Sequence, residues 1–210
     1  LIDGVVNGCP SHLLEPQRSN LFTYSEDFSN AYWTKSGLSV TSNSVISPDG
    51  ILNADKLVEN TTTGEKFTQS IISVSNTTIY TASVFVKFAG REWIRFTDAQ
   101  SSNRIHFNTK TGVFGSVTGT VISYKSTVLG NGWYKLNLTT TSVATAYAIR
   151  IVLAENDNDV SYTGNGTDGV YIYGAMLEQG SYPTSYIPTN GSTVTRVAET
   201  ATGAGDASTF

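Results

Sequence analysis

A short segment with two arginines and a tryptophan offers the most distinctive chemistry in this chain. Residues 91–96 read Arg-Glu-Trp-Ile-Arg-Phe. Because alternate side chains of a strand point to opposite faces, Arg91, Trp93 and Arg95 are expected on one face. An indole can stack on the apolar face of a sugar ring, and guanidinium groups bind carboxylates or sulfates. The segment therefore indicates carbohydrate binding. The alternative is that Trp93 packs under a loop while the arginines pair with nearby carboxylates.

Other basic and aromatic side chains would extend this surface if their strands lie beside it. His106 shares its parity with Arg104 and Asn108, and Arg150 interrupts an otherwise apolar run. The remaining candidates for the same face are Lys135, Tyr171 and Tyr173. Together, these residues would form an aromatic and cationic groove on a chain of net charge −4. Such a groove favours an anionic polysaccharide as the ligand.

One acidic turn could bind a metal ion. Residues 155–159 read Glu-Asn-Asp-Asn-Asp, which offers the oxygen ligands that calcium prefers. The turn lacks the glycine and the terminal glutamate of an EF-hand loop, so a solvated acidic turn is the stronger interpretation. Asp157 and Asp159 are the candidate ligands of a structural calcium ion, and no other cofactor is expected. A single cysteine, Cys9, and two separated histidines exclude a zinc site of Cys/His type.

The segment 164–169 spells the Gly-x-Gly-x-x-Gly pattern of a dinucleotide-binding loop. That chemistry requires a helix N-terminus directly after the pattern, to hold a pyrophosphate. The following residues, VYIYGAMLE, alternate as in a strand. We therefore expect a turn here. The chain also offers no distinctive pair of carboxylates and no nucleophile elbow, so we expect a protein that is not an enzyme.

The elements that would position these residues are all β-strands. The runs 80–88, 133–138 and 147–154 alternate or are largely apolar, and turn signals recur between them. This pattern predicts an all-β fold, a β-sandwich or jelly roll of two antiparallel sheets. We expect an N-terminal arm at 1–20, the sandwich at 21–196 and a C-terminal linker at 197–210. The acidic net charge disfavours nucleic acid as a partner, and no apolar run approaches the roughly 20 residues of a membrane helix.

The two ends of the chain resemble a family of carbohydrate-binding modules associated with phage tails and spikes. The resemblance rests on LLEPQRSNLF at 13–22, Trp33, GWYK at 132–135, YTGNGTDGVYIYGAMLE at 162–178 and SYIPT at 185–189. Three positions depart from the family pattern, with Tyr173 for Trp, Met176 for Gln and Lys135 for Arg. We also expect an Arg18–Glu178 ion pair to join the two terminal segments.

The resemblance implies a non-catalytic module, linked within a longer chain to a catalytic or fibre domain. It would be secreted, extracellular or exposed on a virion. The expected ligand is a polysaccharide or oligosaccharide, carboxylated or sulfated as in marine polysaccharides. A structural or receptor-binding domain of a phage fibre is the first alternative. A jelly-roll polysaccharide lyase is a weaker one, because REWIR matches only one of three motifs of that family.

Overall fold

The computed structural model describes residues 14–199, which form strands connected by turns and contain no helix. The first sheet has the strand order β10 (Phe114–Thr118), β9 (Asn103–Asn108), β8 (Trp93–Asp98), β13 (Ala146–Ala154), β6 (Lys66–Ser73) and β2 (Thr34–Ser36). The second sheet has the order β11 (Val121–Gly130), β12 (Trp133–Thr141), β7 (Ile79–Ala89), β15 (Gly169–Gln179), β4 (Leu52–Glu59) and β3 (Leu38–Ile46). Every pairing between these strands is antiparallel. The predicted all-β sandwich is confirmed. No helix within residues 14–199 could span a membrane.

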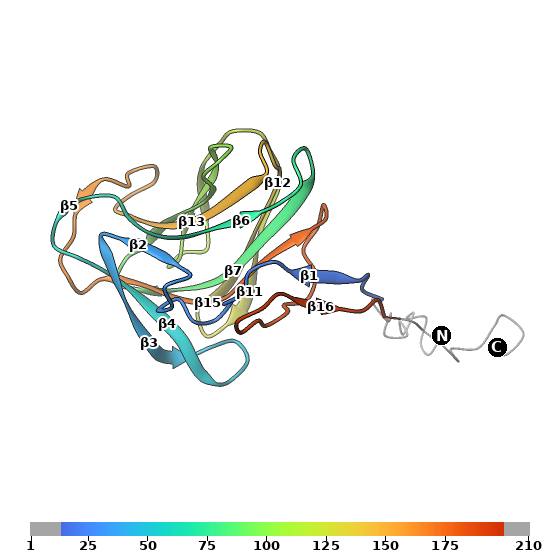
Figure 1. The fold of residues 1–210 in the computed structure, drawn as a ribbon. Coiled ribbons are helices and arrows are strands. Elements are labelled where there is room, and N and C mark those ends of the chain that lie inside the picture. Colours follow the sequence, from blue (N-terminus) through green and yellow to red (C-terminus); the bar gives the residue numbers. More distant parts are fainter. Residues whose placement is uncertain (1–13, 200–210) are drawn as a thin grey trace, which may run out of the picture.

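Two short ribbons complete the fold. β1 (Arg18–Asn20) pairs with β16 (Val194–Arg196), and β5 (Thr63–Gly64) pairs with β14 (Tyr162–Thr163). The β1–β16 ribbon lies at the right of the sandwich in Figure 1. β1 begins inside the segment expected as an N-terminal arm, so residues 18–20 belong to the folded unit. Cys9 and the rest of 1–13 lie outside the described residues, as does 200–210.

The core lies between the two sheets and follows the alternation of the sequence. On β8, Ile94 and Phe96 are fully buried, as expected, while Trp93 and Arg95 are only partly buried. The other buried members come from both sheets and include Ala82, Val84, Val86, Ile105, Phe107, Leu136, Leu138, Ile149 and Ile151. Burying such aliphatic and aromatic side chains contributes about 1.5–3 kcal/mol each relative to leaving them exposed. The core therefore fixes which side chains point outward from each sheet.

The turn at 164–169 has the predicted structure and no helix follows it. It connects β14 to β15, and β15 starts at the last glycine, Gly169. A Cβ atom at Gly169 would overlap the carbonyl oxygen of Leu57, and one at Gly164 would overlap that of Asn60. These glycines allow the turn to approach the neighbouring backbone closely. The Gly-x-Gly-x-x-Gly pattern thus has a packing role here.

Candidate functional site

The outer face of the first sheet brings together several of the predicted binding residues. Arg95 on β8 is directly opposite His106 on β9. The next outward residue on β8, Thr97, lies between Arg104 on β9 and Arg150 on β13. Neighbouring strands are about 4.8 Å apart, so three guanidinium groups share a region about 10 Å wide. We call this surface the arginine face, formed by Arg95, Arg104, His106 and Arg150 with Trp93, Glu65, Phe67 and Gln69 beside them.

Glu65 is shared by two of these arginines. Its carboxylate accepts a hydrogen bond from Arg95 and one from Arg150, the latter at 3.1 Å between Nη1 and Oε2. Arg150 also donates to Gln69 at 2.8 Å, and its guanidinium lies 4.1 Å from the centre of the Phe67 ring. Burial lowers the pKa of Arg95, and Glu65 opposes this while the two neighbouring arginines add to it. The arginines are therefore held in a cluster that one carboxylate neutralises only in part.

Arg104 has no such partner. Within residues 14–199 its side chain makes no hydrogen bond and no ion pair, although its Nε is buried. The Nε of Arg95 is also buried without an acceptor. A buried hydrogen-bond donor that lacks an acceptor costs about 1–3 kcal/mol. An anion placed here would complete both sets of hydrogen bonds.

His106 lies beneath this cluster and is fully buried. Its Nδ1 is 3.1 Å from the carbonyl oxygen of Ser116 and 3.8 Å from Oδ1 of Asp157. Because a carbonyl only accepts, Nδ1 carries the proton, and Nε2 has no partner among the described residues. Burial lowers the pKa of His106, against the opposing effects of the Ser116 carbonyl and Asp157. The ring is therefore neutral near pH 7 and adds no positive charge to the arginine face.

Trp93 lies at the first position of β8, at one end of the arginine face. Its indole packs against the backbone of Gly115 on β10, where a Cβ would approach the ring to 2.7 Å. This contact is part of the loop packing that we considered as the alternative for Trp93. The side chain nevertheless remains partly exposed and is on the same face as Arg95.

The two aspartates considered as calcium ligands have different surroundings. Asp157 accepts hydrogen bonds from the backbone N–H of Ser116, at 2.8 and 3.0 Å, and from its hydroxyl at 2.9 Å. The backbone of Asp159 closes a turn with Glu155. No group of three or more His, Cys, Asp or Glu residues within 14–199 is arranged to hold a metal ion. Asp157 is thus occupied by protein donors, and the calcium ion stays a prediction.

Arg91 is not part of the arginine face, so its expected position was wrong. It precedes β8 and forms a two-point ion pair with Glu59 of the other sheet, with distances of 3.0 and 2.7 Å. Its guanidinium also lies 4.5 Å from the centre of the Tyr162 ring. The alternation rule fails at Arg91 because the strand begins only at Trp93.

Lys135, Tyr171 and Tyr173 belong to the second sheet, so the single groove expected from the sequence does not form. Lys135 and Tyr173 flank Phe85 on the outer face of that sheet, and Tyr171 is opposite Lys87. Tyr173 is only 3% exposed, and the Lys135 ammonium donates to the carbonyl of Thr184 at 2.9 Å. Thr184 and Tyr186 thus contact Lys135 and Tyr173, respectively.

Three neighbours of the arginine face were missed in the sequence. Glu65, Phe67 and Gln69 come from β6 and the residue before it, which pairs with β13. In the run 66–73 the structure buries polar residues and directs Phe67 and Gln69 outward, which the polarity of the sequence does not predict. What the sequence also lacked was the neighbour relation, because the segment between β6 and β13 contains six other strands.

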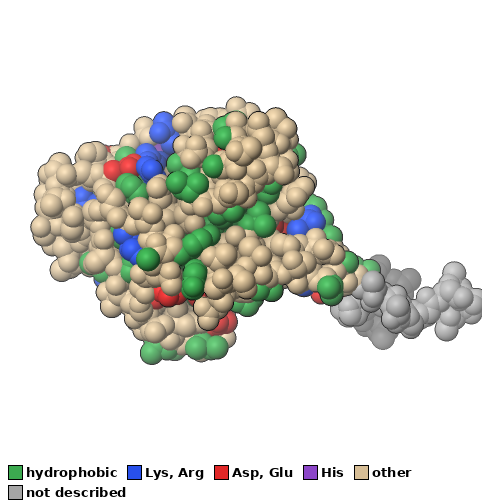
Figure 2. Space-filling model, in the orientation of Figure 1, with side chains coloured by type: hydrophobic (Ala, Val, Ile, Leu, Met, Phe, Trp, Pro, Cys, Tyr) green, Lys and Arg blue, Asp and Glu red, His purple; other side chains and the backbone are tan. Residues whose placement is uncertain are grey.

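The described carboxylates of the arginine face are already engaged by protein groups. Its only carboxylates are Glu65 and, at its edge, Asp157, and both already accept hydrogen bonds from protein groups. Among the outward residues described on β8, β9, β13 and β6 there is no tyrosine that could serve as an acid or base. On the side of the molecule that Figure 2 shows, most of the surface is uncharged, and basic and acidic side chains occur in a few small groups.

No protein-family model matches this chain, and no curated protein matches it. Solved structures with a similar fold include the following two. The enzymatically active domain of bacteriophage CBA120 tailspike protein 4 is 17% identical with a TM-score of 0.43, and the match covers 75% of this chain and 21% of that one. TmCBM61, solved in complex with β-1,4-galactotriose, is 11% identical with a TM-score of 0.46, and the match covers 77% and 99%. At these values neither likeness assigns a family or a ligand to this chain.

Proposed function

We propose that this chain is a non-catalytic carbohydrate-binding module whose arginine face binds an anionic polysaccharide. The observation that carries the proposal is the unpaired guanidinium of Arg104 beside two arginines that share one carboxylate. The surface is locally positive although the whole chain has a net charge of −4. Carboxylate or sulfate groups match the paired N–H donors of arginine.

The surroundings of the arginines fit a sugar chain better than a small inorganic anion. Trp93 offers a partly exposed ring at one end, and sugar rings stack on aromatic side chains through their apolar face. Gln69 is opposite Arg150 on β6, and its side-chain NH2 group makes no hydrogen bond within residues 14–199. Amide side chains can both donate to and accept from sugar hydroxyls. The face thus combines charge, stacking and neutral polar contacts across four strands.

A structural role in a phage fibre is the second candidate, and one surface feature favours it. Large aliphatic side chains are exposed near the ends of the β3–β4 and β11–β12 hairpins, namely Ile46, Ile51, Leu52, Val128 and Leu129. Exposed apolar patches often mark contacts with other protein chains. A stable trimer in analytical ultracentrifugation would favour this role. In either role the module would be secreted or exposed on a virion, as part of a longer chain.

Affinity electrophoresis tests the proposed function. The chain is run through gels that contain alginate, carrageenan, an agar-type galactan, ulvan or a neutral glucan. We expect retardation in at least one acidic gel, and we expect Trp93→Ala to remove it while the protein stays folded by circular dichroism. Tyr124→Ala is the matched control, since Tyr124 is an exposed aromatic residue on β11 of the other sheet.

The proposal fails if no acidic gel retards the protein. It also fails if Trp93→Ala and Tyr124→Ala reduce retardation equally, because the binding surface would then lie elsewhere.

A further inference from the structure

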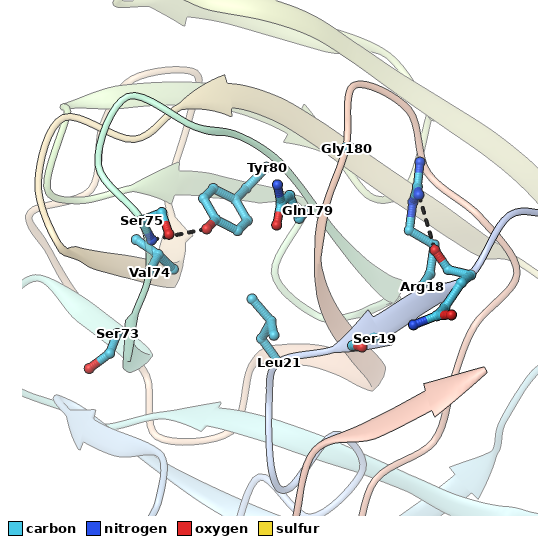
Figure 3. A pocket seen from close by; sticks show the side chains of 10 residues that line it. Arg18, Ser19, Leu21, Ser73, Val74, Ser75, Tyr80, Gln179 and Gly180 are labelled. Carbon is cyan, nitrogen blue, oxygen red and sulfur yellow. Dashed lines mark hydrogen bonds between the residues drawn. The ribbon is translucent and has the colours of Figure 1, made fainter. Parts of the chain in front are cut away.

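A groove separates the β1–β16 ribbon from the body of the sandwich. It has a volume of about 700 Å³, within the range of known small-ligand sites. Its walls come from β1 and its neighbours, from the loop after β6, from β7 and from the end of β15 (Figure 3). The lining residues are Gln17, Arg18, Ser19, Leu21, Ser73, Val74, Ser75, Tyr80, Gln179 and Gly180. Residues 17–21 and 179–180, which are far apart in the sequence, therefore meet at this groove.

The groove contains no group that would select a charged ligand. No carboxylate lines it, and Arg18 is its single cation. The Arg18 guanidinium already faces Glu178, at 3.4 Å between Nε and Oε2, and lies 5.3 Å from the centre of the Tyr182 ring. Its charge is thus balanced inside the protein. This is the opposite of the arginine face, where Arg104 has no counterion.

Unused hydrogen-bonding groups point to a ligand rich in hydroxyls. Gln17 and Gln179 are exposed residues, and their side-chain amides make no hydrogen bond within residues 14–199, so both are free to contact a ligand. The hydroxyl oxygen of Tyr80, a residue that is only 3% exposed, accepts from the N–H of Ser75 at 3.0 Å. No described group accepts the Tyr80 proton in return. These groups offer both donors and acceptors at short range, which is what a sugar hydroxyl requires.

Apolar surface is interleaved with these polar groups. Leu21, Val74 and the ring of Tyr80 line the same groove, as the close-up in Figure 3 shows. Tyr182, stacked on Arg18, is 50% exposed beside it. Apolar and aromatic walls with a few polar groups are typical of sites that bind the C–H face and the hydroxyls of a sugar.

We propose that this groove is a second carbohydrate-binding site, selective for an uncharged sugar unit. It is separate from the arginine face in position and in chemistry, so the two sites can be tested independently. A chain with both would hold a polysaccharide through acidic groups on one surface and through neutral units on the other.

The experiment titrates the ¹⁵N-labelled full chain with neutral tetrasaccharides from β-1,4-galactan, cellulose, mannan and xylan. Heteronuclear NMR follows the side-chain amide signals of Gln17 and Gln179, which lie in the groove. We expect saturable shifts of these signals with at least one tetrasaccharide. Gln179→Ala should weaken that binding about tenfold, the effect of losing one or two hydrogen bonds.

Two further variants separate this site from the proposed function. Ser73→Trp places a bulky ring into the groove from an exposed position, and we expect it to abolish binding of the tetrasaccharide. Arg104→Gln should leave that binding unchanged even where it removes binding to acidic polysaccharide. The inference is overturned if none of the four sugars produces saturable shifts. It is also overturned if the shifts map to Trp93 and its neighbours, or if Ser73→Trp binds like the unmodified chain.

Discussion

The outer faces of the two sheets carry similar residue types but differ in how these side chains are paired and covered. On the first sheet, Arg95 and Arg150 share the carboxylate of Glu65, and Arg104 has no partner among the described residues. On the second sheet, which we call the covered face, Lys135 donates to Thr184 and Glu178 is held by Arg18 and Thr184. The charged groups Lys135 and Glu178 of the covered face thus have partners, although the buried Oδ1 of Asn137 there has none among the described residues. On the arginine face, by contrast, a whole guanidinium group, that of Arg104, has no partner within residues 14–199.

The two faces differ because a segment near the C-terminus packs on the covered face. A bulge in β15 at Gly174, where φ is +59°, lets the chain near Tyr186 pack on the covered face. A Cβ at Gly174 would lie 2.7 Å from Phe85 and 3.2 Å from Tyr186, so glycine is required there. The Tyr186 ring then contacts both Phe85 and Tyr173, each at 5.7 Å between ring centres. Outward position in a strand therefore does not by itself mean an accessible surface.

The two faces should differ most in the free energy of unfolding that is lost when the carboxylate of each face is removed. Glu178 is fully buried, and burial raises its pKa although Thr184 and Arg18 contact it. Glu178→Ala leaves those groups without an acceptor and should reduce the free energy of unfolding by about 3–5 kcal/mol. Glu65→Ala should cost only about 1 kcal/mol, since the Glu65 side chain is 29% exposed. Urea unfolding of both variants measures the difference.

Equal losses of stability in the two variants would show that the faces do not differ in this way. A Glu65→Ala variant that binds acidic polysaccharide more weakly than the unmodified chain would also contradict the account. Removing Glu65 exposes two guanidinium groups to the ligand, so its binding should be the same or stronger.

A smaller effect is expected from pH, through His106. Its folded-state pKa is lowered mainly by burial, whereas the unfolded value is about 6.5. The folded state thus binds this proton less tightly than the unfolded state does. Its contribution to stability is complete above about pH 6.5 and is lost as the pH falls through the folded-state pKa. The slope from this one group is at most about 1.4 kcal/mol per pH unit.

The free energy of unfolding should therefore fall more steeply below pH 6.5 in the unmodified chain than in His106→Gln, which cannot titrate. Urea unfolding at several pH values between 5 and 8 measures both slopes. Parallel profiles would mean that His106 is not held neutral by its surroundings.

Much of the fold could be predicted from local patterns. Alternation predicted the sandwich and the burial of Ile94 and Phe96, since side chains on one face of a strand must meet a common core. The charges in the terminal segments predicted the Arg18–Glu178 pair, which is present at 3.4 Å. The strand-like residues after 169 correctly excluded a helix there. Each of these predictions depends on residues that are close in sequence or on a pair of opposite charges.

The site could be predicted only in part, because it depends on which strands are neighbours and on what covers them. Arg95, His106 and Arg150 were correctly expected to share a face if their strands adjoin, and they do. Lys135 and Tyr173 have the same outward parity but lie on the other sheet, beneath the terminal segment. No local pattern in one sequence distinguishes these two outcomes.

The most direct test of the central claim is the dissociation constant for the acidic polysaccharide that retards the chain most strongly in the gels. Arg104→Gln and Lys125→Gln remove the same charge, but Lys125 is exposed on β11 of the second sheet. We predict at least tenfold weaker binding for Arg104→Gln and a change below about twofold for Lys125→Gln, since one lost charge-assisted contact is worth about 1.5–3 kcal/mol. Equal weakening in both variants, or none in Arg104→Gln, would contradict the arginine face as the binding surface.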